Sequence, residues 1–322
     1  MGGEGRPQVA IAIVTVGPGE VLAAALESMA ADVQAGLAEV WVVDNGSEDG
    51  SAEMVERRFP WARLVVPGEN LGYGRAVNLV ADRSQAPWVA ASNDDVELRP
   101  GALVRLLAVG DANPRAAALA PRLELPDGTT QHSPHPFPTV GFSLAFNAGL
   151  FRLSPAAADR WCLEGRWNPS VAREVPWAMA AFLLIRRDVF EELGGFSAEQ
   201  FMHAEDLDLG WRIARAGLAP RYEPGAVVLH HGSVSTTAVF GAGLQQRWTA
   251  ATYSWMARTR GLPRTRAVAA ANIAGAAARW GAFAVLARLS PRRWGSARDA
   301  AREWTRVHRA GLRPRGELER RF

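Results

Sequence analysis

The stretch VAASNDDVEL, residues 89–98, sets the organisation of the chain. Its apolar first half has the composition of a buried strand, and this strand ends in two neighbouring carboxylates, Asp94 and Asp95. Two adjacent acids repel each other unless a positive charge lies close by. The stretch therefore indicates a buried strand whose carboxyl end meets a cation.

Strand and helix patterns alternate on both sides of this stretch. Short apolar runs predict strands at 9–14, 39–44, 62–67 and 87–92, and helix patterns lie at 19–31, 51–59, 73–83 and 100–108. Such alternation predicts mostly parallel strands with helices on both faces of the sheet. Beyond residue 110 we expect a hairpin at Asp127-Gly128, strands at 180–187 and 225–235, and a helix within 201–217.

One long segment, residues 132–177, shows only weak periodicity and is rich in Pro, Phe, Trp and Gly. Segments of this length without elements of their own are usually functional or covering loops. We therefore expect such a loop here, or elements that the pattern does not reveal.

Polar residues collect where the predicted strands end. The four groups are Thr15, Asp44 to Ser47, Asn70 to Gly74, and Asn93 to Asp95. Turn chemistry alone would explain any one of them, because Asn, Asp, Gly and Ser are common turn residues. Four groups at four corresponding ends favour a ligand site, since open α/β sheets bind ligands outside the carboxyl ends of their strands.

Charge is divided unevenly along the 322 residues. All 36 basic residues are arginine; residues 1–240 carry 19 of them with 29 acidic residues, whereas residues 241–322 carry 17 with 4 acidic residues. We predict a domain at 1–240, with a net charge of −10, and a basic helical extension at 241–322, with a net charge of +13. Such asymmetry suggests an anionic partner for the extension.

Three partners suit the basic extension: an anionic membrane surface near a lipid-linked acceptor, the acidic body of the same chain, or a second copy. A spanning helix at 266–290 is less favoured, because Arg279 interrupts the apolar run. No nucleic-acid-reading motif is present. The first residues lack a secretory signal, so we expect a cytoplasmic protein, with peripheral contact at the inner face of the membrane if the first partner applies. The single cysteine, Cys162, excludes an internal disulfide.

Several residues suit metal and acid–base chemistry. Asp95 supplies a hard oxygen ligand for Mn²⁺ or Mg²⁺, and His230 or His231 adds a nitrogen that favours Mn²⁺ over Ca²⁺. Glu205, Asp206 and Asp208 open a predicted helix, where acids also compensate the helix dipole. Asp208 can pair with Arg212, which leaves Glu205 or Asp206 as a general base.

Nucleotide binding is indicated by hydrogen-bonding groups rather than by a phosphate-loop motif. Asp44 can accept a hydrogen bond from the N3–H of a pyrimidine, and glycines in NLGYG (70–74) allow close approach of a nucleotide. No G-x-G-x-x-G follows the first strand and no G-x-x-x-x-G-K-[ST] is present, which argues against dinucleotide enzymes and P-loop NTPases.

Six stretches in order resemble one family. They are VAIAIVTV, VVDNGSEDGS, ENLGYGRAVN, NDDV, FLLIRRDVFEELGGFSAEQFMHAEDLDLGWRIARAG and VVLHHGSVS, between about residues 9 and 235. Together they resemble the family-2 glycosyltransferases with the GT-A fold, especially the rhamnosyltransferase-like members. The resemblance implies an α/β fold with a mostly parallel, Rossmann-like sheet. It also implies inverting transfer of a sugar, with dTDP-rhamnose as our expected donor, to an acceptor hydroxyl in glycan, glycolipid or natural-product glycoside synthesis.

The resemblance also implies roles for individual residues. Asp206 is expected as the catalytic base with Glu205 near the acceptor, and Asp95 and His230 as metal ligands. A dTDP- or UDP-sugar is expected at Thr15, Asp44, Asn45, Asn70, Gly72, Gly74, Asn93 and Asp94, and the acceptor at Trp177. The chain departs from the family pattern at Asn93, where an Asp is common, so the metal would depend more on Asp95, His230 and the diphosphate.

Two other functions fit part of the pattern. A sugar-nucleotide pyrophosphorylase uses a similar nucleotide site, but it would need a basic, glycine-rich loop after the first strand, which TVGPGEVLAA does not provide. A non-catalytic nucleotide-sugar-binding relative would not need both the Asp95/His230 set and the Glu205/Asp206 pair.

Overall fold

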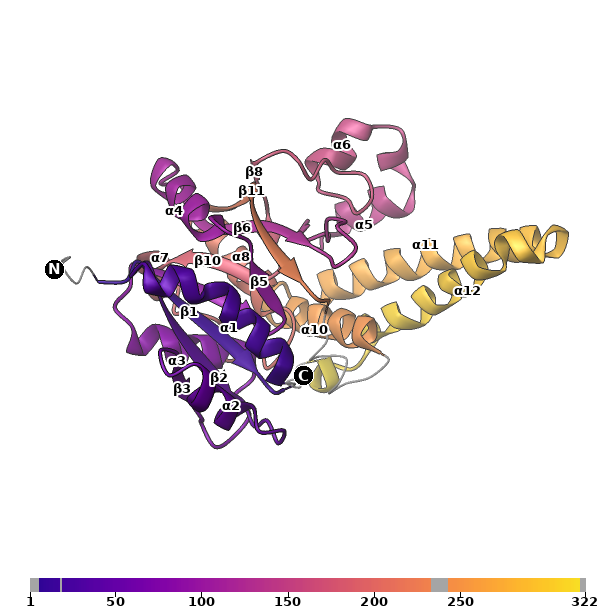
Figure 1. Cartoon of the computed structure of the whole chain (residues 1–322). Coiled ribbons are helices and arrows are strands. Elements are labelled where there is room, and N and C mark those ends of the chain that lie inside the picture. Colours follow the sequence, from indigo (N-terminus) through magenta and orange to yellow (C-terminus); the bar gives the residue numbers. More distant parts are fainter. Residues whose placement is uncertain (1–5, 18, 233–242, 319–322) are drawn as a thin grey trace. The chain divides into compact units, whose positions relative to one another are not determined.

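The computed structural model describes residues 6–17, 19–232 and 243–318 (Figure 1). The chain divides into two compact units: the first comprises residues 1–136 and 167–242, and the second comprises residues 137–166 and 243–322. The predicted domain boundary at residue 240 and the last residues of the strand predicted at 225–235 lie outside the described residues.

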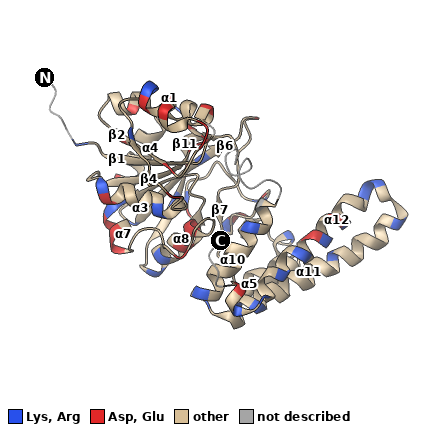
Figure 2. Cartoon of the chain, turned by 90° about the horizontal axis from the view of Figure 1, so that it is seen from below, with Lys and Arg blue, Asp and Glu red and all other residues tan. Residues whose placement is uncertain are grey.

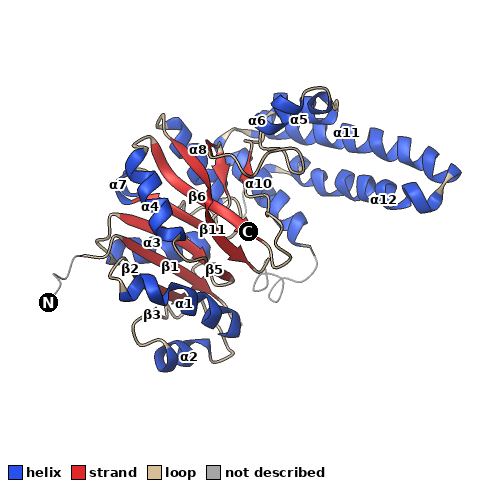
Figure 3. Ribbon diagram, turned by 45° about the horizontal axis from the view of Figure 1, so that its top comes forward, coloured by secondary structure: helices blue, strands red, loops and turns tan. Residues whose placement is uncertain are grey.

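The first unit is an α/β structure built on one large sheet (Figure 3). Its strands are β1 (Val9–Thr15), β2 (Ala38–Asp44), β3 (Arg63–Val65), β4 (Trp88–Asn93), β5 (Val96–Leu98), β6 (Ala116–Glu124), β8 (Arg173–Glu174), β10 (Phe182–Arg186) and β11 (Ala219–His230). β7 (Pro134–His135) and β9 (Trp177–Ala178) form a separate pair. Its helices are α1 (Gly19–Gln34), α2 (Ser51–Arg58), α3 (Tyr73–Arg83), α4 (Ala102–Ala112), α7 (Arg187–Glu192) and α8 (Glu205–Arg215).

The strand order β3-β2-β1-β4-β10-β6-β11-β5 places the polar strand ends side by side. β1 runs parallel to β2 and β4, so Thr15 pairs with Asp44 and Val14 with Asn93. β10 is antiparallel to β4 and brings its amino end to the same edge. At the far end of the sheet, β5 pairs antiparallel with β11 and sets His230 opposite Val96.

The core follows from the two hydrophobic periods. Val9, Ile11 and Ile13 alternate along β1 and turn one face of the strand toward the core. Leu22 and Leu26 of α1 meet this face at helical spacing. Residues of α2 and α4 join the same cluster, and α3 lies on the opposite face of the sheet from α1 (Figure 2).

Most predicted elements of the first unit are present with boundaries within a few residues. The antiparallel bridge between Glu124 and Thr130 confirms the predicted hairpin. The predicted mostly parallel sheet is confirmed, and within it β10 runs antiparallel to β4 and β6. The pattern also missed β5 and α7, which are short, and most of the nine-residue β6.

The second unit is helical. It contains α5 (Val140–Asn147), a 3₁₀ turn η1 (Leu150–Arg152), α6 (Pro155–Arg160), α10 (Leu244–Thr259), α11 (Leu262–Leu289), α12 (Pro291–His308), η2 (Arg309–Leu312) and α13 (Arg315–Leu318). The prediction of a helical tail is confirmed for its described residues. Helices α5 and α6 lie in the segment for which a long loop was one expectation.

Hydrogen bonds between polar side chains connect the helices of the second unit. Asn147 on α5 donates to Asn272 on α11 at 2.8 Å, and Asn272 donates to the Tyr253 hydroxyl on α10 at 3.3 Å. The Tyr253 hydroxyl lies 2.9 Å from His308 Nδ1 on α12. This network explains why a segment from the middle of the chain, 137–166, belongs to the same unit as the C-terminal helices.

Candidate active site

Asp44 is fixed at the end of β2 by its own turn. The buried carboxylate accepts hydrogen bonds from the backbone N–H groups of Gly46, at 3.0 Å, and Ser47, at 2.7 Å, and from the Ser47 hydroxyl. A carboxylate offers about four lone-pair directions. Three are used here, and the remaining capacity suits one further donor, such as the N3–H of a pyrimidine.

The loop before α3 is tied to the end of β2 through Asn45. Its amide donates to the carbonyl of Gly72 at 3.3 Å and accepts from the N–H of Leu71 at 3.4 Å. The side chain of Asn70, on the exposed part of this loop, accepts from the N–H of Gly72 at 2.9 Å. The second and third polar groups of the sequence therefore form one connected surface.

Gly72 and Gly74 make room for the protein's own chain. Gly72 has φ 76°, and a Cβ there would collide with the carbonyl oxygen of Phe201. A Cβ on Gly74 would lie 2.8 Å from the Cβ of Phe196. Packing against residues 196–201 is thus a sufficient reason for both glycines, and their contact with a nucleotide stays a prediction.

Replacing Gly72 by Ala should destabilise the protein by about 2–5 kcal/mol, because the cost of a left-handed backbone conformation adds to the cost of the collision with Phe201. Gly68→Ala is the matched control: Gly68 has φ 82°, and a Cβ added there would have no atom within 4 Å, so only the conformational cost of about 1–2 kcal/mol applies. Urea unfolding of both variants measures the difference. Equal losses would show that the 196–201 segment is not packed as described.

Asp94 is oriented toward the end of β1. The Thr15 hydroxyl donates to Asp94 Oδ2 at 2.7 Å and accepts from the N–H of Gly17 at 3.0 Å. Thr15 and Asp94 are both buried. The first and fourth polar groups are therefore in direct contact.

Asp95 and His230 meet although they lie far apart in the sequence. His230 Nε2 lies 3.2 Å from Asp95 Oδ1, and both side chains are buried. The amide nitrogen of Asn93 lies 3.5 Å from the same Nε2. The pairing of β5 with β11 causes this meeting, because β5 begins directly after Asp95 and β11 ends at His230.

Gln131 holds the other ring nitrogen of His230. Its Oε1 lies 2.6 Å from His230 Nδ1, so with this amide orientation Nδ1 carries the proton in a neutral ring and Nε2 presents a lone pair to Asp95. Asp95 Oδ1 and His230 Nε2 thus face each other with lone pairs at 3.2 Å, and a cation or a proton between the two atoms stabilises this arrangement. A hydrogen bond that fixes the distal nitrogen is also the usual arrangement around metal-binding histidines.

His231 has a different partner. Its Nε2 lies 2.6 Å from Glu97 Oε1, and both side chains are partly exposed. The structure therefore brings the side chain of His230 to the carboxylate of Asp95, whereas His231 contacts Asp95 through its backbone N–H, which donates to the Asp95 carbonyl at 2.9 Å. Within the described ranges, no group of three or more His, Cys, Asp or Glu side chains is arranged to hold a metal ion.

Glu205 and Asp206 begin α8 directly after two residues with positive φ, His203 at 65° and Ala204 at 64°. Glu205 is buried, and its Oε2 has no hydrogen-bond partner among the described residues. Asp206 is partly exposed and accepts from the N–H groups of Leu207, at 2.8 Å, and Ala180, at 3.3 Å. Asp206 is thus the member of the pair that a substrate can reach.

Both carboxyl groups are harder to ionise than usual. Burial, with the neighbouring charge of Asp206, raises the pKa of Glu205 to about 8. Enclosure raises the pKa of Asp206 to about 6, against the opposing effect of its two backbone hydrogen bonds. Asp208 takes the structural part predicted for it, with Arg212 Nε 2.7 Å from its Oδ2.

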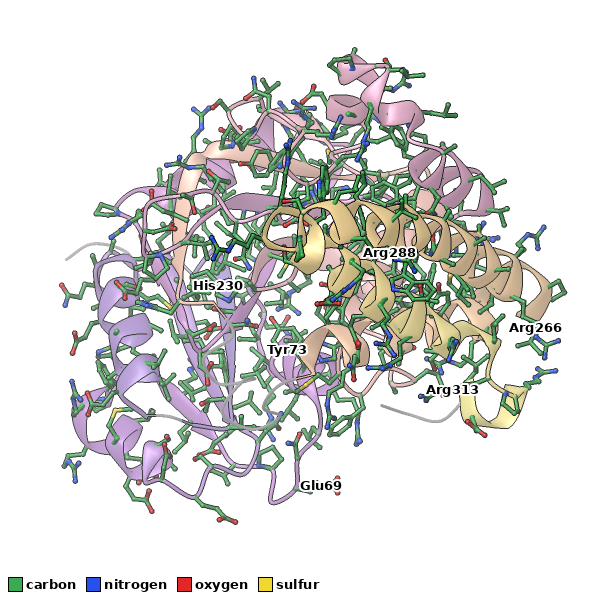
Figure 4. All side chains as sticks on the ribbon, turned by 90° about the vertical axis from the view of Figure 1, so that its right-hand side faces the viewer. Glu69, Tyr73, His230, Arg266, Arg288 and Arg313 are labelled. Atoms are coloured by element: carbon green, nitrogen blue, oxygen red, sulfur yellow. The ribbon has the colours of Figure 1, made fainter. Side chains whose placement is uncertain are left out.

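Tyr73 connects the two groups of acids. Its hydroxyl donates to the carbonyl of Ala180 at 2.5 Å. Its pKa lies well above 10, first because the hydroxyl is buried and then because four carboxylates act on it: Glu205, Asp206, Asp95 and Asp94. Tyr73 and Asp206 also meet at one residue, because the Tyr73 hydroxyl donates to the carbonyl of Ala180 and the N–H of Ala180 donates to Asp206; Figure 4 labels Tyr73 and His230 in the first unit.

Two contributors to this site, Tyr73 and Gln131, were not singled out from the sequence, and Ala180 stands out there only as a departure from the Gly common in the family, not for its backbone. Tyr73 stands between two glycines in a strand-end loop, and this position was an available signal. Gln131 and Ala180 act through contacts that no local pattern reveals.

Trp177, the predicted acceptor-binding residue, is held by packing contacts in the structure. Its side chain is buried, its indole N–H donates to the carbonyl of Pro136 at 3.1 Å, and its ring stacks on His135 at 4.7 Å. These contacts assign Trp177 a packing role, and we do not carry its acceptor role further.

Comparison with known proteins identifies the family of the chain. The family described as "Glycosyl transferase family 2" matches residues 10–194. The chain belongs to glycosyl transferase family 2. It is 34% identical over 276 residues, 77% of this chain and 88% of the relative, to an N-acetylglucosaminyl-diphospho-decaprenol L-rhamnosyltransferase of Mycobacterium tuberculosis. The predicted rhamnosyltransferase-like membership is confirmed, and the chain is a sugar-transferring enzyme of glycan or glycolipid synthesis.

Solved structures support the fold at lower identity. A mannosyltransferase from Pyrobaculum calidifontis, solved with GDP-Man and Mn²⁺, has a TM-score of 0.57 at 17% identity over 95% of this chain and 85% of its own. GalNAc-T7, solved with UDP, GalNAc and Mn²⁺, has a TM-score of 0.56 at 13% identity over 76% and 47%. These likenesses confirm the predicted GT-A fold of this glycosyltransferase.

Proposed function

We propose that this glycosyltransferase transfers a sugar, with rhamnose as the expected one, from a dTDP- or UDP-linked donor to a hydroxyl of a lipid-linked acceptor, with inversion at the anomeric carbon. The observation that carries the proposal is the approach of Asp95 to His230 at 3.2 Å, directly beside the Thr15–Asp94 hydrogen bond at the carboxyl end of β1. The lipid-linked acceptor is supported by the mycobacterial relative, whose substrate by name is a diphospho-decaprenol.

Different residues are expected to bind different parts of the donor. Asp44 is placed to accept from the base, and Asn45 and Asn70 organise the loop that borders it. The Thr15–Asp94 hydrogen bond, at 2.7 Å, connects the end of β1 to the Asp94–Asp95 pair at the end of β4. Thymine and uracil present the same N3–H, so both bases fit Asp44.

Asp95 and His230 fit a divalent ion. A carboxylate oxygen and the unprotonated nitrogen of a neutral imidazole both present lone pairs, so a cation between them is favourable, and here these two atoms lie 3.2 Å apart. Mn²⁺ accepts both ligand types, and the two solved relatives hold Mn²⁺. When bound, the ion would neutralise charge on the departing diphosphate.

Asp206 is placed to remove the proton from the acceptor hydroxyl. It is partly exposed, and its two backbone hydrogen bonds hold the carboxylate in one orientation. The deprotonated hydroxyl then attacks the anomeric carbon from the face opposite the leaving diphosphate, which inverts the configuration. Glu205 lies buried beside Asp206, and its raised pKa favours its neutral form at neutral pH.

We further propose that the basic second unit makes a peripheral contact with the membrane that carries the acceptor. This unit holds 20 arginines and 6 acidic residues, a net charge of +14. Anionic lipid surfaces attract such clusters.

A product assay tests the proposed function. The protein is incubated with dTDP-rhamnose or UDP-sugars and Mn²⁺, with and without a lipid-linked N-acetylglucosamine acceptor, and the products are separated. Release of nucleoside diphosphate with a glycosylated product of inverted configuration is expected. Sugar phosphate as product would point to a pyrophosphorylase, and no turnover of any donor would leave only a binding protein; either result contradicts the proposal.

Gln131→Leu should weaken Mn²⁺ binding by about 10–100-fold, the usual effect of removing a hydrogen bond that orients a metal-binding histidine. The change removes the 2.6 Å contact to His230 Nδ1. Calorimetric titration of Mn²⁺ in the presence of nucleoside diphosphate measures the effect without relying on turnover. Gln131→Glu, which still accepts from Nδ1, should retain the affinity; equal losses in both variants would reject this orienting role.

The rate of transfer should rise with pH through about 6, because Asp206 accepts a proton only when it is ionised and its pKa is raised to about 6. Values of kcat/KM measured over a pH series that brackets this pKa, at saturating Mn²⁺, should show this ascending limb. A profile that is flat over this range would contradict the assignment of Asp206 as the base.

A further inference from the structure

Exposed apolar side chains are concentrated in the second unit. Of the fourteen large apolar side chains that are exposed in the described part of the chain, eleven belong to this unit, although it holds about a third of the residues. Single exposed apolar residues are ordinary, but a concentration of this kind marks an interaction surface.

The clearest part of this surface is the end of the α11–α12 hairpin, residues 279–298, which we call the hairpin end. Ala287 is its single buried residue, while Trp280, Val285 and Leu289 are 43%, 59% and 82% exposed. Phe283 and Trp294 stack on each other across the two helices at 5.7 Å. The hairpin end thus carries large apolar groups without a core of its own.

Its charges are of one sign. Five arginines and no acidic residue lie in the hairpin end: Arg279, Arg288, Arg292, Arg293 and Arg298. Asp299, the next residue along α12, pairs with Arg298 at 2.8 Å, and the other four arginines have no acidic residue beside them in the sequence. Arg288 stands on its surface (Figure 4), and blue residues predominate over red along α10, α11 and α12 (Figure 2). Arg293 lies over the ring of Trp294 at 5.2 Å.

Exposed apolar side chains together with arginines indicate an anionic bilayer as the partner of the hairpin end. Trp with Arg on an apolar helical surface is typical of segments that lie in the interface of anionic bilayers. A second copy of the same surface would set five arginines against five, which is unfavourable. α11 has the length of a spanning helix, and an 18-residue stretch of it has a mean hydropathy of 1.2, but a span would carry Arg279 into the hydrocarbon.

We propose that the hairpin end is a membrane-insertion element: its apolar side chains enter the interface of an anionic bilayer, and its arginines bind the lipid phosphates. This inference rests on the membrane contact in the proposed function, and it names the element and the lipid chemistry. Catalysis on a soluble acceptor would not require it.

Vesicle flotation of the full-length protein tests the apolar part. The protein is mixed with phosphatidylglycerol–phosphatidylcholine vesicles, and the bound fraction is measured against lipid concentration. The double variant Val285→Ser/Leu289→Ser should lower the partition coefficient about tenfold or more, because each change removes a large apolar contact with the interface. The control Val104→Ser/Val171→Ser changes two exposed valines of the first unit and should bind as the wild type does.

Charge is tested in the same assay. Arg292→Gln/Arg293→Gln should weaken binding roughly 25-fold, from roughly fivefold for each arginine near an anionic surface. Arg57→Gln/Arg58→Gln, an adjacent exposed pair on α2, is the control. Point variants are preferable to truncation at residue 240, which would divide the second unit. Thermal unfolding and donor hydrolysis without lipid should be unchanged in all four variants.

The outcomes separate this inference from the proposed function. Wild-type binding that survives both hairpin-end changes would overturn the inference while leaving another membrane contact in place. Absence of wild-type binding would overturn both membrane statements, and unchanged donor hydrolysis would still support the enzyme. Three further results would contradict insertion at an anionic interface. The first is equal binding to pure phosphatidylcholine, and the second is a salt-independent dimer that Val285→Ser/Leu289→Ser breaks. The third is resistance of the bound protein to carbonate extraction.

Discussion

Replacing Asp206 by Asn is expected to lower the turnover number for sugar transfer by about 10²–10⁴-fold, the usual contribution of a general base. The amide has the shape of the carboxylate, and its single oxygen can still accept the 2.8 Å hydrogen bond from Leu207, whereas the 3.3 Å bond from Ala180 to the second oxygen is lost, so the side chain stays in place with one fewer hydrogen bond. The affinity for nucleoside diphosphate should therefore stay close to that of the wild type. Initial rates and calorimetric titration measure the two quantities on the same preparation.

Glu205→Gln is the matched comparison, since it alters the adjacent carboxyl group. Burial and the charge of Asp206 raise the pKa of Glu205 to about 8, so at neutral pH the wild-type side chain is mostly uncharged and Gln resembles it. A modest loss of turnover is expected. If Glu205→Gln abolished transfer while Asp206→Asn kept it, the two roles would have to be exchanged.

The second large effect is expected for Asp95→Asn, with a loss of about 10²-fold or more in kcat/KM, because Lewis-acid stabilisation is worth several kcal/mol. The change removes the negative charge that faces His230 Nε2 at 3.2 Å and keeps the shape of the side chain. Stimulation of transfer by Mn²⁺ should weaken in parallel. Rates measured across a Mn²⁺ titration would show both changes.

Glu97→Gln provides the control for Asp95→Asn. Glu97 lies two residues further along and pairs with the partly exposed His231 at 2.6 Å. Its loss should leave the response to Mn²⁺ unchanged. Full Mn²⁺ stimulation in Asp95→Asn would reject the proposed ligand, whatever the effect on the rate.

The strand ends were predictable from the sequence because parallel strands carry their carboxyl ends to one edge. Thr15 pairs in register with Asp44, and Asn93 lies opposite Val14 on the other side of β1. Local patterns predict each strand's last residue to within one or two positions, and parallel pairing then brings these last residues to the same edge of the sheet. This part of the site needed no knowledge of distant contacts.

Residue chemistry paired Asp95 with either His230 or His231, and only the resemblance selected His230, since their meeting depends on a three-residue strand, β5, too short for a pattern. Gln131 reaches His230 from the end of the predicted hairpin, across 99 positions. Membership of residues 137–166 in the second unit depends on side-chain hydrogen bonds such as Asn147 with Asn272. Periodicity carries no information about such pairings.

Glycines and aromatic residues were the least predictable in role. Gly74 is in a motif typical of nucleotide sites, yet its absent side chain leaves space for Phe196. Trp177 lies in a segment of weak periodicity, and its burial is decided by β7, β9 and α8 together. Tertiary packing sets both outcomes, so residue type alone is ambiguous there.

The most direct test of the central claim is an anomalous-scattering map at the manganese edge, from crystals soaked with Mn²⁺ and a nucleoside diphosphate. We predict one strong peak beside Asp95 and His230, with the diphosphate next to it and Asp206 facing the same cavity. Diphosphate density at the strand ends without a manganese peak at Asp95 and His230, or a peak at another site, would contradict the account.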